Sequence, residues 1–182
     1  HKLTMASTYK LFVGYAVLKR VDEGSIKLAD PVGGSTFDGC MRKMIINSDN
    51  QCAIAMGERV GWNNIVADGK ALGASDLDWT DDAHGSVSDC AVLLGKLARN
   101  EVLTEQSRNY YLELMRTQVY RQGIPAGTSY TVADKVGFLG PQLNDAAIVY
   151  APDLTHVIVI YTNGESWATI AEITRQIESL AL

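Results

Sequence analysis

The feature that most constrains this chain is a run of eight apolar residues from Leu11 to Leu18. A helix that is hydrophobic on every side is stable in the interior of a protein, and this run is too short to cross a membrane. We therefore expect a buried helix from about Ser7 to Val21, with Gly24 placed to end it. The other elements must pack around it.

Two chemically active side chains precede this run. Positions three apart share a helical face, so Ser7 and Lys10 are expected side by side at the N-terminal end of the helix. A hydroxyl is a weak nucleophile until a base removes its proton, and a partly desolvated lysine can be that base. Free N–H groups at a helix N-terminus also suit a developing oxyanion. A capping serine and a solvated lysine would show the same spacing, so other motifs in the chain are needed to distinguish a catalytic pair from this ordinary one.

The first two thirds of the chain carry helical patterns. Apolar spacing and capping residues predict five further helices, at about 36–45, 51–60, 63–72, 89–99 and 104–117. Residues 75–88 are polar and irregular. This part, about 7–117, is expected to form a helical subregion.

Beyond Pro125 the pattern changes to strands. They are expected at 130–137, 146–150 and 157–161, with turns at 144–145 (Asn-Asp) and 152–153 (Pro-Asp). An amphipathic helix from about Trp167 to Leu180 closes the chain. The fold class is therefore α/β of the α+β type, a single domain over 1–182 with an antiparallel sheet and its covering helix at about 128–182.

Composition narrows the possible partners. The 182 residues suffice for one domain with a real core, and the net charge of −5 argues against a nucleic-acid or anionic-membrane surface. No apolar stretch is long enough for a transmembrane segment. The three histidines lack ligand spacing, so we expect neither a metal nor a cofactor. No signal peptide is visible, which says nothing about compartment because a processed chain would look the same.

The three cysteines fall into two groups. Cys90 lies in an apolar segment and is expected to be a small buried hydrophobe. Cys40 and Cys52 flank Ser48 and could bridge neighbouring helices, which would imply an oxidising compartment. Two buried free thiols would give the same sequence, and the alternatives stay open.

Three short motifs occur in a meaningful order: Ser7-x-x-Lys10, then Ser48-Asp49-Asn50, then Lys135-Val136-Gly137. S-x-x-K, S-D-N and K-T-G in this order are the signature of class A β-lactamases and penicillin-binding proteins. The chain resembles that serine hydrolase superfamily, which includes the D-Ala-D-Ala peptidases, through most of its length. The segments 7–21, 44–50, 124–127, 133–135 and 158–162 also look like the corresponding family segments. Alone, the second motif would be an ordinary turn between helices and Lys135 an exposed strand lysine.

The resemblance implies roles for four catalytic residues. Ser7 would be the nucleophile that forms an acyl-enzyme, and Lys10 its base or proton relay. Ser48 would pass a proton to the leaving nitrogen, and Lys135 would poise Ser48 and attract the substrate carboxylate.

The resemblance also implies a substrate-binding set. Asn50 would offer its amide to the amide of the substrate side chain. The backbone N–H groups of Ser7 and Phe138 would form the oxyanion hole, and Gly137 would let substrate approach the strand closely. Val136 stands where the family has Thr or Ser, so weaker or altered carboxylate recognition is expected.

Two departures from the family pattern bear on function. The Glu-x-x-Leu-Asn segment, whose Glu activates the deacylating water in class A β-lactamases, has no counterpart between Leu77 and Ser88. That loop holds Asp78, Asp81 and Asp82, which as a cluster would usually be solvated surface. Relatives also place two strands and a helix before the nucleophile helix. Either these elements were removed here or the domain uses a smaller sheet.

These features predict an extracytoplasmic serine hydrolase that forms an acyl-enzyme with a D-Ala-D-Ala peptide or a β-lactam, a small-molecule or peptide substrate. A β-lactamase with an unusual water activator, such as Asp78 or Asp82, is one alternative. A binding or sensor module with weak catalysis is another.

Overall fold

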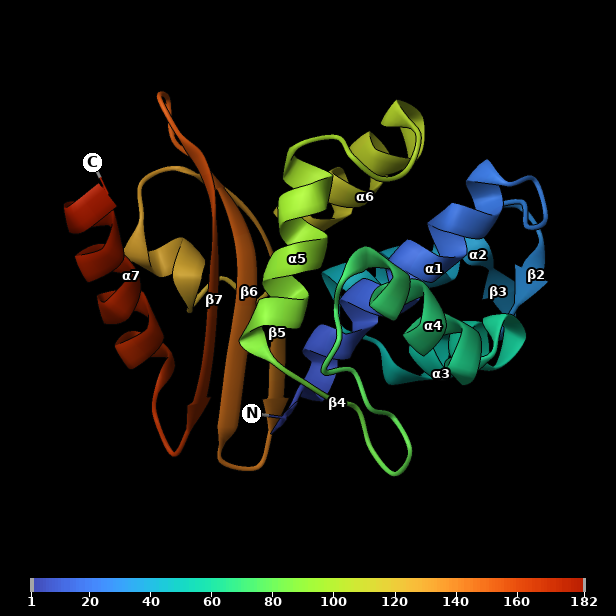
Figure 1. The fold of residues 1–182 in the computed structure, drawn as a ribbon, viewed down its shortest axis with the longest axis horizontal. Helices are drawn as coiled ribbons and strands as arrows, with labels where there is room; N and C mark the ends of the chain where they lie inside the picture. Colours follow the sequence, from blue (N-terminus) through green and yellow to red (C-terminus); the bar gives the residue numbers. More distant parts are fainter. Residues whose placement is uncertain (1, 182) are drawn as a thin grey trace.

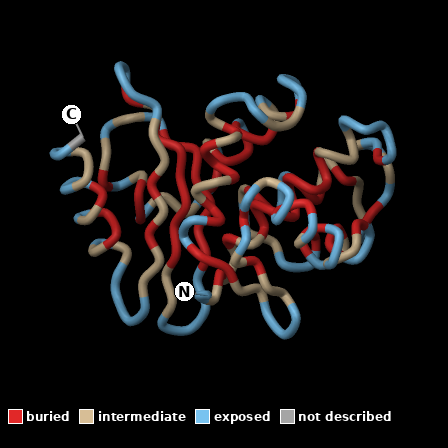
Figure 2. The backbone as a smooth tube through the Cα atoms, in the orientation of Figure 1, coloured by how far each residue is buried: buried red, intermediate tan, exposed pale blue. Residues whose placement is uncertain are grey.

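The computed structural model of the chain describes residues 2–181. The main sheet has three strands. Figure 1 shows helix α7 on one face of this sheet and the block of other helices on the opposite side. At the centre of the block lies α1 (Lys10–Asp22), in which every residue from Lys10 to Leu18 is buried. The apolar run is thus the core helix that the sequence predicts (Figure 2).

The expected helices are all present, with boundaries shifted by a few residues. They are α2 (Phe37–Ile46), α3 (Asn50–Val60), α4 (Trp62–Leu72), α5 (Val87–Ala98), α6 (Glu105–Arg116) and α7 (Trp167–Ala181). Side-chain caps set several starts: Thr36 accepts a hydrogen bond from the N–H of Gly39 at α2, and Ser86 forms a capping box with Asp89 at α5. Gly73, with a φ of 106°, ends α4 in the left-handed region.

The segment that carries Ser7, the predicted nucleophile, differs from expectation in its local geometry. Ser7 lies in η1 (Ala6–Tyr9), a turn of 3-10 helix, and the α-helix proper begins at Lys10. A second 3-10 segment, η2 (Ile124–Gly127), lies next to α7 (Figure 1).

The main sheet consists of β5 (Thr131–Leu139), β6 (Gln142–Tyr150) and β7 (Thr155–Asn163), antiparallel and in the order β5-β6-β7. Leu139 pairs with Gln142, so Gly140 and Pro141 form the two-residue turn of the first hairpin. Gly140 has a φ of 55°, which suits the first central position of a primed turn.

The prediction of a turn at Asn144 and Asp145 is therefore wrong. Both residues lie inside β6, and both are buried. Asn144 donates hydrogen bonds to the carbonyls of Thr4 and Met5, and Asp145 accepts one from the N–H of Ile124. These partners remove the cost of burying polar side chains, so tertiary contacts override the local turn preference. The second expected turn, at 152–153, does separate β6 from β7.

Two short ribbons complete the fold. β1 (Leu3–Thr4) pairs with β4 (His84–Gly85), and β2 (Pro31–Val32) pairs with β3 (Ser35–Thr36). The first ribbon ties the start of the chain to the otherwise irregular segment 75–88. Of the helices within residues 2–181, none has the length and apolar character needed to span a membrane.

The two faces of the sheet belong to different cores. Ala133, Ala146 and Ile148 pack with the helical block, whereas Val132 and Ala147 pack toward α7. Because side chains alternate along a strand, Lys135 follows Ala133 on the face of the helical block. This alternation directs Lys135 toward Ser48, to whose Oγ its Nζ donates a hydrogen bond.

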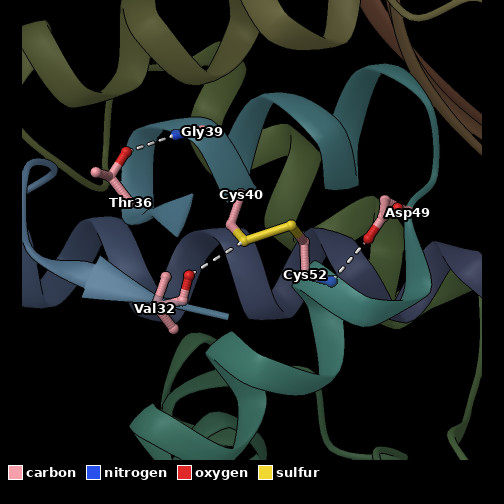
Figure 3. Close-up of a disulfide and its surroundings, with 6 residues drawn as sticks. All are labelled: Val32, Thr36, Gly39, Cys40, Asp49 and Cys52. Carbon is pink, nitrogen blue, oxygen red and sulfur yellow. Dashed lines mark hydrogen bonds between the residues drawn. A yellow bond between two sulfur atoms is a disulfide. The ribbon is translucent and has the colours of Figure 1, made fainter. Parts of the chain in front are cut away.

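A disulfide joins Cys40 on α2 to Cys52 on α3, as Figure 3 shows. It resolves the alternatives that the sequence leaves open for this pair. The bridge encloses the turn that carries Ser48 and Asn50, and Asp49 caps α3 there by accepting a hydrogen bond from the Cys52 N–H at 2.7 Å. Cys90 is a buried free thiol, as the sequence predicts.

Candidate active site

Lys10 lies at the centre of the predicted catalytic cluster. Its Nζ is 3.1 Å from Ser7 Oγ and 3.2 Å from Ser48 Oγ. Two shorter contacts, both 2.6 Å, join it to the Ser48 carbonyl and to Asn50 Oδ1. The fold thus brings together residues 7, 10, 48 and 50, which are up to 43 positions apart in the sequence.

The four contacts of Lys10 differ in kind. The carbonyl of Ser48 and the amide oxygen of Asn50 can only accept hydrogen bonds, whereas both hydroxyls can donate or accept. A neutral lysine has two N–H groups and one lone pair. If its two N–H groups go to the two acceptor oxygens, the lone pair faces the hydroxyls, so the arrangement is that of a base directed at Ser7.

Burial prepares Lys10 for this role. Its side chain is buried, and desolvation lowers its pKa to about 8, with a partly opposing influence from the Asp49 carboxylate. A substantial fraction of Lys10 is therefore neutral at the upper end of the physiological pH range.

Lys135 approaches Ser48 from the sheet. Its Nζ donates to Ser48 Oγ at 3.0 Å and to the Val136 carbonyl at 2.8 Å. Burial and, to a smaller extent, repulsion from Lys10 together lower the pKa of Lys135 to about 7. The hydroxyl of Ser48 thus lies between two lysine nitrogens and can exchange a proton with either.

Two backbone conformations set the positions of the serines. Ala6, directly before Ser7, has a φ of 45°, and Ser48 itself has a φ of 59°. Both values lie in the left-handed region, which costs about 1–2 kcal/mol for a residue with a Cβ. Such strain at functional positions is held by the surrounding structure. Thr8 helps to fix the backbone beside Ser7, because its Oγ1 contacts the Met5 carbonyl and the Tyr161 hydroxyl, each at 2.6 Å.

The third motif lies against the backbone of the nucleophile turn. A Cβ built on Gly137 would come within 2.8 Å of the Ser7 nitrogen and 2.9 Å of the Met5 oxygen and Thr8 nitrogen. Glycine is therefore required for β5 to reach the nucleophile turn. Val136 is buried, and Phe138 is exposed, with its ring packed edge-on against Tyr120 at 5.4 Å.

The backbone of β5 directs some of its N–H groups away from β6. The Val136 N–H donates to Gln118 Oε1 beyond the free edge of the strand. In a strand, the N–H groups of residues two apart point the same way, so the Phe138 N–H also points to this edge. It lies next to Gly137, which abuts the Ser7 nitrogen. The role of the Ser7 and Phe138 N–H groups as an oxyanion hole stays a prediction.

A buried polar network supports β5 from behind, and the sequence reasoning missed it. Gln118 and Arg121 both hydrogen-bond the carboxylate of Asp134, and Arg121 also reaches the Val132 carbonyl. Burial raises the pKa of Asp134 well above its usual range and that of Asp145 to about 6. The sequence signal that could have indicated this network is the position of Asp134 directly before Lys135. Its partners, buried Gln118 and partly exposed Arg121, come from a loop that has no motif of its own.

The acidic loop divides into two parts. Asp78 binds Lys2 Nζ at 2.8 Å and Thr80 Oγ1 at 2.6 Å, which hold its pKa below the usual range. A carboxylate held this way is a poor proton acceptor. Asp81 and Asp82 instead line a cavity together with Tyr9. No group of three or more His, Cys, Asp or Glu side chains in the described part of the chain could hold a metal ion.

Comparisons with known structures identify the fold. The chain matches a structure of PBP-A with a TM-score of 0.90 at 22% identity, covering 100% of this chain and 82% of that one. The class A β-lactamase of the last common ancestor of Gram-negative bacteria matches with a TM-score of 0.91 at 22% identity, covering 100% of this chain and 86% of that one. A β-lactamase from Xanthomonas campestris matches with a TM-score of 0.90 at 20% identity, covering 100% and 85%. The α+β fold expected from the sequence is confirmed.

Comparisons of sequence add the family. No curated protein sequence matches the chain. A family profile described as the beta-lactamase enzyme family matches residues 34–181. This range includes Ser48, Asn50 and Lys135 and begins after Ser7 and Lys10. Since it spans most of the chain, the protein belongs to the beta-lactamase enzyme family, within the β-lactamase and penicillin-binding superfamily of serine hydrolases.

Proposed function

We propose that this protein is an acyl-transferring serine hydrolase whose nucleophile is Ser7 and whose substrates are D-Ala-D-Ala peptides or β-lactams. The single observation that carries the proposal is the contact of Lys10 Nζ with Ser7 Oγ at 3.1 Å, with Lys10 buried and its pKa lowered to about 8. A serine with a neutral amine within hydrogen-bond reach is an activated nucleophile.

Acylation follows from this geometry. The Ser7 hydroxyl gives its proton to the neutral amine of Lys10 as Oγ bonds to the substrate carbonyl carbon. The resulting oxyanion accepts hydrogen bonds from the N–H groups of Ser7 and Phe138. When the intermediate collapses, the carbon–nitrogen bond breaks, and the leaving nitrogen takes the proton of Ser48. Ser48 recovers a proton from the lysine ammonium beside it, so the protons balance.

Lys135 and Asn50 act on the substrate in this proposal. A protonated Lys135 attracts the substrate carboxylate, and Asn50 presents its amide to the substrate side chain. Val136 offers no hydroxyl to the carboxylate, which is the expected weakness of this site. In one structural relative, a variant of PBP-A, an acyl-enzyme complex with penicillin G has been captured, which supports the same chemistry here.

Deacylation decides between a peptidase and a β-lactamase. Of the two acids expected as unusual water activators, Asp78 is paired with Lys2 and Thr80, which leaves Asp82, at the cavity beside Tyr9. Because the sequence lacks the Glu that activates the deacylating water in class A β-lactamases, we expect slow hydrolysis of a penicilloyl adduct. This favours a penicillin-binding, D,D-peptidase-like enzyme over an efficient β-lactamase, and it leaves a sensor that acylates once as the second alternative.

The disulfide supports an extracytoplasmic location, because such bonds persist in oxidising compartments. Members of this superfamily act on the cell wall or its mimics, which lie in the same compartment.

One experiment tests the proposal. The protein is incubated with penicillin G, and intact mass and released penicilloate are followed together. We expect a Ser7 adduct that persists for many minutes in the wild type and no adduct in Ser7→Ala. Rapid release of product would favour the β-lactamase, and a folded wild type that forms no adduct would refute the catalytic proposal. A D-Ala-D-Ala peptide assay then separates a peptidase from a sensor.

A further inference from the structure

One row of residues across the main sheet contacts the turn that carries Ser7. Gly137 on β5 pairs with Asn144 on β6, and Asn144 pairs with Tyr161 on β7. Residues directly opposite one another share a face of the sheet, and this row faces the helical block, against which Tyr161 packs. Gly137 abuts the Ser7 nitrogen, and Asn144 donates a hydrogen bond to the Met5 carbonyl. The third member of the row, Tyr161, is the one with no role in the sequence motifs.

The hydroxyl of Tyr161 lies between two other polar groups. Its Oη is 2.6 Å from Thr8 Oγ1 and 3.2 Å from Cys90 Sγ. Thr8 Oγ1 is in turn 2.6 Å from the Met5 carbonyl oxygen. Thr8 and Cys90 are both fully buried. The four groups therefore form a continuous chain of hydrogen bonds that runs from α5 to the backbone just before Ser7.

The chemistry of these groups fixes the direction of every bond in the chain. A carbonyl oxygen can only accept, so the Thr8 hydroxyl donates its single proton to the Met5 carbonyl. Thr8 must then accept from Tyr161, and the Tyr161 oxygen accepts from the thiol of Cys90. Burial raises the pKa of Cys90 to about 12 and that of Tyr161 well above its usual range, so both groups keep the protons that this order requires. Tyr161 is therefore the donor to Thr8.

The Met5 carbonyl, where this chain ends, controls the backbone that leads to Ser7. Besides the Thr8 hydroxyl, it accepts the Thr8 N–H and the Asn144 amide, each at 3.1 Å. These donors fix the peptide group between Met5 and Ala6, next to the left-handed φ of 45° at Ala6. Ser7 thus has a fixed peptide group before it and the anchored side chain of Thr8 directly after it. Its position is set by these neighbours.

We propose that Tyr161 is a positioning residue for the nucleophile. Acting through Thr8, its hydroxyl holds the left-handed turn that places Ser7 Oγ beside Lys10 Nζ. The inference rests on the proposed function. Loss of the phenol hydroxyl leaves Thr8 without its donor, so the strained backbone before Ser7 relaxes toward an ordinary turn. The nucleophile then spends less time within reach of its base, and acylation slows.

Tyr161→Phe tests the proposal, because it removes the hydroxyl and keeps the ring. Adduct formation with penicillin G is followed by intact mass over a range of concentrations, well below the melting temperature. The rate constant at saturation should fall about tenfold, since one of several hydrogen bonds that hold the turn is lost. The dissociation constant of the complex before acylation should change little, because Lys135 and Asn50 still face the substrate. A hydroxyl that only stabilised the fold would lower the melting temperature and leave both constants unchanged.

Tyr150→Phe is the matched control. Tyr150 lies on β6, and its buried hydroxyl has no hydrogen-bond partner among the described residues, so this variant should acylate at the wild-type rate. Thr8 offers a second route to the same chain. Thr8→Val should slow acylation, and Thr8→Ser, which keeps the hydroxyl, should retain most of the wild-type rate. Tyr161→Phe/Thr8→Val should be no slower than Thr8→Val alone, because both changes interrupt one chain.

Two further readouts avoid catalysis altogether. Amide hydrogen exchange of segment 5–9, followed by mass spectrometry, should be faster in Tyr161→Phe than in the wild type and unchanged in Tyr150→Phe. The infrared S–H stretch reports the direction of the chain, because Cys90 is the remaining thiol and a donating S–H absorbs at lower frequency. This band should move to higher frequency in Tyr161→Phe and vanish in Cys90→Ala. A band that stays in place in Tyr161→Phe would refute the donor order.

The outcomes separate the two proposals. If Tyr161→Phe acylates at the wild-type rate, the positioning role is refuted and the proposed function stands. A loss in affinity alone, at an unchanged rate constant, refutes the positioning role as well. If Tyr161→Phe does not fold, Thr8→Val carries the test, and acylation by this variant at the wild-type rate refutes the chain. If a folded wild type forms no adduct, the proposed function fails and the positioning role with it.

Discussion

The Cys40–Cys52 disulfide allows a prediction that separates stability from catalysis. Reduction breaks the bond without removing either sulfur, so the packing of α2 and α3 keeps all its atoms. The two cysteines are 12 positions apart. The chain-entropy relation for a closed loop of this length gives about 3 kcal/mol of stabilisation at 25 °C, exerted on the unfolded chain.

Loss of this stabilisation should lower the melting temperature by a measurable amount. For a domain of this size, 1 kcal/mol changes the melting temperature by about 2–4 °C, so reduction should lower it by about 6–12 °C. The assay is thermal unfolding followed by circular dichroism, with and without a thiol reductant. Cys90→Ala is the control, because it removes the remaining thiol and should leave the reductant effect unchanged.

The same bridge should leave catalysis almost unaffected at low temperature. Ser48 and Asn50 are held by their own contacts with Lys10, by the Asp49 cap and by the burial of α2 and α3. The rate of acylation at 25 °C is therefore expected to change less than about threefold, which corresponds to under 1 kcal/mol. A tenfold loss of acylation with an unchanged melting temperature would refute this reasoning, because the bridge would then act on the native geometry of the turn.

Three other predictions follow from the site. Acylation by a substrate with a carboxylate should rise and then fall with pH, with its maximum between about pH 7 and 8, because it needs neutral Lys10, whose pKa is about 8, and protonated Lys135, whose pKa is about 7; a flat profile from pH 6 to 9 would contradict these roles. Gly137→Ala should lower acylation by about a hundredfold or more, because its Cβ would lie 2.8 Å from the Ser7 nitrogen, and normal acylation by a folded variant would disprove the close approach. Val136→Thr should raise the acylation rate several-fold for substrates with a carboxylate and leave their neutral esters unchanged, and no gain would refute the expected role of a hydroxyl at this position.

The sequence predicted the parts of the fold that depend on local pattern. The buried helix, the helix ends at Thr36 and Gly73, and the amphipathic closing helix follow from periodicity and caps, which act over a few residues. The cluster around Lys10 could be expected only because three motifs occurred together in a known order. Any one of them, such as Ser48-Asp49-Asn50, has an ordinary meaning as a turn.

The remaining features depend on contacts between distant segments. Asn144 and Asp145 have the composition of a turn, but Thr4, Met5 and Ile124 supply the partners that keep them in a strand. No sequence pattern near Asn144 and Asp145 indicates these partners. The same holds for the cavity beside Tyr9, whose aromatic lining residues Tyr9, Trp62 and Trp79 come from η1, from α4 and from the irregular segment 75–88. Such juxtapositions are properties of the packed chain and have no signature in any one segment.

The two left-handed backbone positions, Ala6 and Ser48, bear on how this chemistry could be built elsewhere. A designer who copies S-x-x-K onto a regular helix and S-D-N onto an ordinary turn would reproduce the spacing of the letters. The serine would then start from a relaxed helical backbone, whereas here Ser7 follows a kink in a 3-10 turn. A scaffold for this reaction has to supply both kinks first, and enough surrounding contacts to hold them. The side chains can be chosen afterwards.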